Sequence, residues 1–141
     1  MTKILNIIST AVIVLFTTCS SDIPTNVDIV GIWKTKDGAL IEFIKGGTFS
    51  TQNLSGNKFF PYEKAYKGKS FHEKGKWEIK KDQGRWIIIL YFNKSKKLPK
   101  GYITDIIIAG SKGILENQPP WYLFVWEEEE GGPRYRFTKK E

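Results

Sequence analysis

Short runs of apolar and aromatic residues, separated by glycine-containing segments, recur along most of this chain and constrain its fold more than any other feature. From Asp28 onward no stretch keeps the apolar period of an amphipathic helix, whereas the runs have the length and composition of strands. They predict strands at 29–35, 39–44, 48–53, 75–80, 85–92, 102–109, 121–127 and 134–138, and a further short strand at 113–115. The sequence therefore predicts an all-β domain.

The segments between these runs indicate how the strands pair. Residues 36–38, 45–47, 81–84 and 110–113 are short and contain glycine, which readily adopts the positive φ of tight turns. Tight turns join antiparallel neighbours, so successive hairpins predict an up-and-down meander. About eight strands are enough to close such a meander into a barrel, which would remove exposed strand edges. The alternative arrangement of the same strands is an open β-sandwich.

The first residues follow the order of an export signal. Lys3 gives a positive start, residues 4–16 form an apolar core, and two small threonines lead to Cys19, the single cysteine. The apolar run is shorter than the roughly 20 residues that a membrane-spanning helix needs, so a permanent helical anchor is the less favoured alternative. Export leads to an oxidising compartment, where an unmodified odd thiol forms unwanted disulfides.

Residues 16–19 resemble the lipobox of bacterial lipoproteins, in which small residues precede a lipid-modified cysteine. The resemblance implies cleavage after residue 18 and a membrane anchor on Cys19; the alternative is a secreted protein with a free thiol. By the same resemblance, Ser20 after the cysteine favours the outer membrane of the cell envelope, with the domain facing the periplasm or the surface. We expect a signal peptide at 1–18, the lipidated cysteine and a linker that holds the domain off the bilayer at 19–27, and one barrel domain at 28–141.

Residues 31–33 (Gly-Ile-Trp), in the first predicted strand, resemble the Gly-x-Trp opening of lipocalin-like barrels. The hairpins at 41–49 and 75–79 are similar to those of small bacterial lipocalin-like lipoproteins. The resemblance implies an envelope protein that binds a ligand or a partner, with Trp33 closing one barrel end and Arg134 or Arg136 over its face. The two-residue period of a strand turns both arginines outward if Tyr135 and Phe137 point inward.

Residues 54–74 form an insert that is much longer than a hairpin turn and rich in lysine, glycine and aromatic residues. Long loops in compact domains are commonly functional or disordered. The aromatic residues favour packing over disorder, because exposed rings gain free energy by burial. We interpret the insert as a lid over one barrel mouth; the alternative is a loop or short helix that plugs the core.

Three predicted strands are apolar on both faces. Residues 86–92, 106–108 and 121–126 contain only apolar and aromatic residues, whereas residues 75–80 alternate. One barrel wall therefore needs cover on its outside as well as its inside. We expect the insert or the connection at 117–120 to supply it; the alternative is contact with another protein or with the membrane.

Few residues are candidates for catalysis or metal binding. His72 is the only histidine, and no free cysteine would remain beside it after lipidation. No serine has the local sequence of a nucleophile elbow. Glu127 to Glu130 form an acidic turn, which we interpret as solvated, because neighbouring strand residues alternate faces and cannot all converge on one cation. The sequence predicts no enzyme activity, no metal and no cofactor.

The net charge of +7 does not indicate nucleic-acid binding, because the lysines are spread over the predicted turns and export separates the chain from nucleic acid. We expect a non-catalytic envelope lipoprotein that binds an apolar small molecule. The alternative is a protein-interaction module, such as an inhibitor, an immunity-type factor or an assembly accessory. The predicted interior residues are Trp33, Phe43, Phe49, Trp77, Trp86, Ile88 and Leu123, with Phe59, Phe60 and Tyr62 near the barrel mouth.

Overall fold

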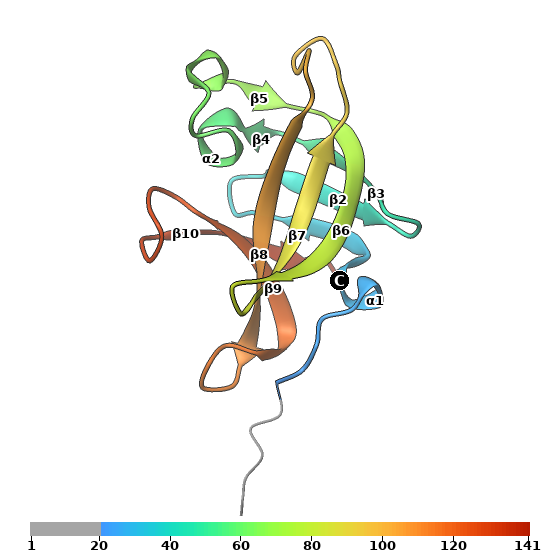
Figure 1. The fold of residues 1–141 in the computed structure, drawn as a ribbon, viewed down its shortest axis with the longest axis vertical. Helices are drawn as coiled ribbons and strands as arrows, with labels where there is room; N and C mark the ends of the chain where they lie inside the picture. The colour runs from blue at the N-terminus through green and yellow to red at the C-terminus, as the bar shows by residue number, and fades with distance from the viewer. Residues whose placement is uncertain (1–20) are drawn as a thin grey trace, which may run out of the picture.

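The computed structural model describes residues 21–141, and the predicted signal peptide and Cys19 lie outside the described residues. Eight antiparallel strands form a closed barrel in the order β1, β10, β9, β8, β7, β6, β3, β2 (Figure 1). They are β1 (Gly31–Lys34), β2 (Leu40–Ile44), β3 (Thr48–Gln52), β6 (Lys74–Asp82), β7 (Arg85–Phe92), β8 (Tyr102–Lys112), β9 (Gln118–Trp126) and β10 (Arg134–Lys139). The predicted meander barrel is confirmed, because pairing of Trp33 with Lys139 joins the first strand to the last and closes the sheet.

The remaining elements are short. They are α1 (Asn26–Ile29), β4 (Leu54–Ser55), α2 (Gly56–Phe59), the 3₁₀ turn η1 (Lys64–Tyr66) and β5 (Ser70–Phe71). None of the helices within residues 21–141 has the length and apolar character that crossing a bilayer requires.

The turn residues explain the hairpins. Asp82 pairs with Arg85 across the β6–β7 hairpin, so only Gln83 and Gly84 connect the strands. Both have positive φ, 46° and 79°, the backbone geometry of a two-residue turn whose twist matches that of the flanking strands. The predicted turn at 81–84 is therefore confirmed.

The β8–β9 hairpin differs from the prediction. β8 continues to Lys112, so the predicted turn at 110–113 is mostly strand, and the short strand predicted at 113–115 is the hairpin loop. Gly110 is needed inside the strand, because a Cβ there would lie 2.0 Å from the carbonyl oxygen of Gln118 at an irregular point of the ladder. The loop extends away from the barrel body at the bottom of Figure 1, near the first described residues.

The segment predicted as a linker is packed against the domain. Thr25 and Asp28 form a capping box, in which the Thr25 amide donates to Asp28 Oδ2 at 2.7 Å, and this starts α1. The helix buries Ile29, and its Ile29 carbonyl oxygen accepts a 2.7 Å hydrogen bond from the Trp33 indole. Pro24 is buried as well. Within residues 21–27, Pro24 therefore packs against the folded domain while the other side chains are exposed.

Large side chains fill the barrel interior. Trp33, Phe43 and Phe49 are each 1% exposed, and together with Trp77 they belong to one core cluster of buried residues. The Phe43 and Trp77 rings meet edge to face with centres 5.2 Å apart, an arrangement that aromatic quadrupoles favour. The predicted inward positions of Ile88 and Leu123 are confirmed by their full burial.

The insert at 54–74 is part of the same core. Phe59 and Phe60 are at most 1% exposed, and Phe59 packs against Phe137 of β10 with ring centres 5.8 Å apart. Phe60 lies 4.6 Å from the ring centre of Tyr102, at the start of β8. Tyr62, by contrast, is 91% exposed. The insert therefore packs as a plug at the barrel end, the alternative that the sequence left open beside a lid.

Candidate functional site

The outer face of β8 and β9 carries a second apolar cluster, made of Ala109, Tyr122, Phe124, Ile107 and Trp126. Two arginines of β10 cover its rings. The Arg134 guanidinium carbon lies 4.5 Å from the ring centre of Phe124 and 5.3 Å from that of Trp126. The Arg136 guanidinium carbon lies 3.7 Å from the ring centre of Tyr122. Such cation–π contacts contribute from about 0.5 to 2 kcal/mol each, depending on how far water is excluded.

The groups that cover this outer face are not the ones that the sequence predicted. The sequence predicted that the insert or residues 117–120 would cover the wall, but the guanidinium groups of the neighbouring strand do so. The expectation that Arg134 or Arg136 lies over Trp33 is also wrong. Tyr135 and Phe137 point inward, so the arginines that alternate with them point outward. The cation near Trp33 is Lys139, whose Nζ lies 5.8 Å from the ring centre.

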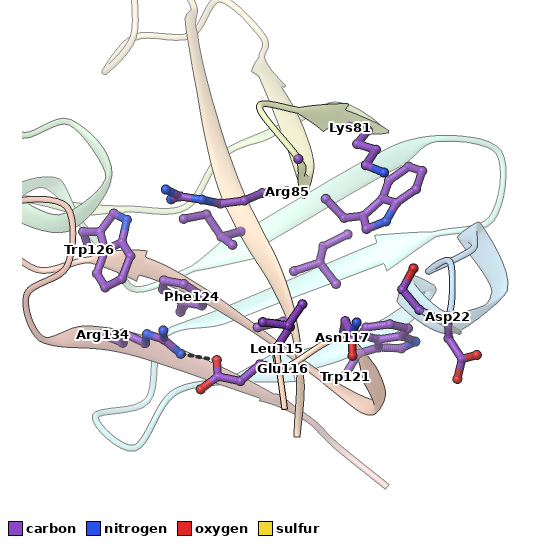
Figure 2. Close-up of a pocket in the computed structure, with 16 residues that line it drawn as sticks. Asp22, Lys81, Arg85, Leu115, Glu116, Asn117, Trp121, Phe124, Trp126 and Arg134 are labelled. Carbon is purple, nitrogen blue, oxygen red and sulfur yellow. Dashed lines mark hydrogen bonds and ion pairs between the residues drawn. The ribbon is translucent and has the colours of Figure 1, made fainter. Parts of the chain in front are cut away.

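A polar network fixes the β8–β9 loop to β10. Arg134 Nη1 donates to Glu116 Oε2 at 2.6 Å (Figure 2). The Tyr122 hydroxyl donates to the same oxygen at 2.8 Å. The hydrogen bond from Arg134, joined by the one from Tyr122, lowers the pKa of the Glu116 carboxyl below its usual value. Burial raises the pKa of Tyr122, so this phenol stays protonated at neutral pH. The loop is therefore held to the strand by an ionised carboxylate.

A pocket of about 500 Å³ lies beside this network. Three of the chain's five tryptophans line it, Trp86, Trp121 and Trp126, together with Phe124. Figure 2 shows Trp121 at one side of the pocket and Trp126 with Phe124 at the other. Its polar lining residues are Asp22, Lys81, Arg85, Glu116, Asn117 and Arg134. Pockets for small molecules are typically of this size, with apolar walls and a few polar groups.

Separate parts of the chain converge on the pocket. Trp121 pairs with Gly110 across the β8–β9 ladder. Trp86 is the second residue of β7, and Lys81 Nζ lies 5.6 Å from the centre of its ring. The N-terminal segment completes the lining, where the Asp22 amide donates to the Asn117 carbonyl oxygen at 3.2 Å. Only the closed barrel brings these segments together.

A second groove, of about 660 Å³, runs between the outer face of β8, the insert and the acidic loop after β9. Two ion pairs hold that loop: Lys58 Nζ lies 2.9 Å from Glu127 Oε1, and Arg85 pairs with Glu130. The acidic segment is thus partly tethered and not only a solvated turn. The groove shares Arg85, Ile107, Phe124 and Trp126 with the pocket, so the two are continuous along the outer wall.

The predicted ligand residues lie in three places. The packed core holds most of them, namely Trp33, Phe43, Phe49, Trp77, Phe59 and Phe60. Trp86 lines the pocket and Tyr62 the groove. His72 is exposed, and within residues 21–141 no group of three or more acidic, histidine or cysteine side chains is arranged to hold a metal ion.

Sequence analysis did not select Trp121 and Trp126 as ligand residues. The signal that pointed to them was the strand apolar on both faces, which indicates a wall with something to bind or to cover. Comparison of the chain with protein-family models, curated proteins and solved structures finds no match.

Proposed function

We propose that this protein is a non-catalytic lipoprotein of the cell envelope, anchored through Cys19, that binds an apolar or aromatic small molecule with a polar end. The observation that carries the proposal is that one pocket of about 500 Å³ is lined by Trp86 and Trp121 at one side and by Trp126 at the other (Figure 2). Indole rings offer large apolar surfaces and lose little conformational entropy on binding. Lys81 and Arg85 offer positive partners for the polar end of the molecule.

The filled barrel interior leaves the binding site to the barrel end, where Trp86 and Trp121 pack against the edge of the core, and to the adjoining outer wall, where Trp126 lies. Trp33, Phe43 and Phe49 are almost fully buried against one another and the rest of the core. A well-packed core is rigid and resists volume changes, so it makes a stable scaffold for residues on the outside. The barrel therefore supports the site, and the ligand binds beside the β8–β9 hairpin and not in the barrel interior.

Binding of 1-anilinonaphthalene-8-sulfonate, an aromatic sulfonate whose fluorescence rises in apolar surroundings, tests the pocket. Trp121→Leu keeps an apolar side chain but removes most of the indole surface, and we expect about tenfold weaker binding from a loss of roughly 1.4 kcal/mol. Tyr62→Ala removes an exposed ring that lines only the second groove, and its affinity is expected to equal that of the wild type. Equal affinity for all three proteins would contradict the pocket.

Mass spectrometry of the protein extracted from membranes tests the anchor. We expect a chain that begins at Cys19 and carries the added mass of acyl chains. A chain that keeps residues 1–18, or that carries an unmodified thiol, contradicts the anchor and leaves the pocket to be judged by the dye.

A second candidate function is protein interaction through the groove. The groove contains the carboxylates of Asp82, Asp105, Glu128 and Glu129, and its residue Ile103 is 66% exposed. Such a surface suits a basic, extended segment of a partner, since opposite charges raise the association rate. A photo-crosslinking residue at Ile103 is expected to capture a partner that Glu129→Lys abolishes. Crosslinks that survive the charge reversal speak against this use of the groove.

A further inference from the structure

We propose that the barrel end with the β8–β9 loop faces the lipid bilayer, and that Ile114 and Leu115 insert into it. The inference rests on the proposed anchor at Cys19 and adds the orientation of the domain. Ile114 is 93% exposed and Leu115 76%, side by side in a loop that extends from the barrel. Single exposed apolar residues are ordinary on protein surfaces, but two neighbours at the tip of a projecting hairpin form a compact apolar point.

The chain itself brings the anchor to this loop. The hydrogen bond between the Asp22 amide and the Asn117 carbonyl oxygen holds the N-terminal segment against the hairpin. Cys19 lies three residues before Asp22, and consecutive Cα atoms are about 3.8 Å apart, so the two Cα atoms can be separated by at most about 11 Å. Acyl chains on Cys19 therefore enter the bilayer on the side of the domain that carries this loop.

The packed segment at 21–27 strengthens this restriction. A free linker would let the barrel rotate above the membrane in any orientation. Pro24 is buried and Ile29 is fully buried, so no flexible spacer within the described residues separates the anchor from the barrel. Ile23, 64% exposed, adds a third apolar side chain beside the same contact.

The loop has acidic neighbours in Asp22 and Glu116, and beside them lie a lysine and two tryptophans of the kinds that suit a membrane interface. Lys112, at the end of β8, is exposed, and lysine side chains keep their ammonium group in water while their methylenes lie along apolar surface. Trp86 and Trp121 line the adjacent pocket, and amphipathic indoles are enriched where lipid meets water (Figure 2). The opposite barrel end, with the insert, carries exposed lysines such as Lys67.

A single reporter dye distinguishes the two ends. If Cys19 is acylated, a cysteine introduced by Ile114→Cys is the only free thiol and can carry an environment-sensitive nitrobenzoxadiazole dye. Lys67→Cys at the opposite end is the matched control, and both positions are exposed, so neither substitution disturbs the core. The lipidated protein is placed in vesicles of phosphatidylcholine and phosphatidylglycerol, with and without nitroxide-labelled lipid.

We expect the dye at 114 to show blue-shifted, several-fold brighter emission that nitroxide lipid quenches, and the dye at 67 to emit as in water. Protein that floats with the vesicles but shows aqueous emission at both positions overturns the orientation and leaves the anchor standing. A blue shift at 114 that depends on protein concentration and not on vesicles indicates a second copy on the loop, and also overturns it. An unmodified Cys19 in protein that does not float overturns both.

Discussion

Phe60→Ala tests whether the insert at 54–74 is a structural plug. Phe60 is fully buried and meets four rings edge to face, with centres 4.6 Å from Tyr102, 4.8 Å from Phe71, 5.4 Å from Tyr66 and 5.5 Å from Phe92. Two of these rings belong to the insert and two to β7 and β8. The side chain therefore joins the insert to the barrel wall.

The expected cost follows from this packing. Truncating a buried phenylalanine to alanine loses transfer free energy and leaves a cavity, together about 3–5 kcal/mol. Each edge-to-face contact adds roughly 0.5–1.5 kcal/mol beyond area burial, which favours the upper part of that range. For a domain of this size a loss of 1 kcal/mol lowers Tm by roughly 3–6 °C, so we expect a decrease of about 10–25 °C.

Urea unfolding of Phe60→Ala and Tyr62→Ala measures the loss in the free energy of unfolding directly. Tyr62→Ala, two residues away and 91% exposed, is the control and is expected to change the free energy of unfolding by no more than about 0.5 kcal/mol. Phe60→Leu keeps part of the volume and provides a milder variant if Phe60→Ala does not fold. A loss below about 1 kcal/mol for Phe60→Ala would refute the plug, because a lid that opens freely contributes little to global stability.

Three further predictions concern the polar contacts and the hairpin. The lowered pKa of Glu116 means that its ion pair with Arg134 stabilises the fold above about pH 4.5 and is lost as the pH falls through the folded pKa; Glu116→Gln should be less stable than wild type by up to about 1 kcal/mol at pH 7, with the difference shrinking in urea titrations as the pH is lowered through that folded pKa. Tyr135→Phe removes the hydroxyl that donates to Asp37 at 2.9 Å and should cost about 1 kcal/mol in the same assay, whereas no change would show that the bond contributes nothing. Gly110→Ala places a Cβ 2.0 Å from a carbonyl oxygen across the β8–β9 ladder, and we expect a loss of about 1–3 kcal/mol by thermal unfolding; an unchanged Tm would contradict the close approach.

The strands and the inward-facing residues could be predicted from the sequence, because successive side chains of a strand point to opposite faces of the sheet. Every second residue therefore points to the same face. Phe49 and Trp77 each lie between two polar residues, and each is buried in the barrel. Glycine at the short turns carries equally local information, since positive φ is a property of single residues. Where the signal was ambiguous the prediction failed, as at Gly110, which serves as a strand residue in a tight cross-strand contact and not as a turn.

The candidate site was less predictable, because its residues are far apart in the chain. Trp86, Trp121 and Asp22 come from three segments that meet only when the barrel closes. Their sequence neighbours carry no sign of that meeting. Strands that are apolar on both faces indicated that the outer wall needs cover, but not which groups provide that cover.

The sequence by itself determined an antiparallel meander with an aromatic interior and left a closed barrel and an open sandwich as alternatives, because alternation and turn chemistry are local and act within a few residues. The tertiary structure alone decided that the sheet closes, that β10 places Arg134 and Arg136 over the outer rings, that the insert seals one end, and that Trp86 and Trp121 line a pocket together with the N-terminal segment. These arrangements depend on the closure of the sheet and on which side chains best exclude water from one another, and both are properties of the whole chain.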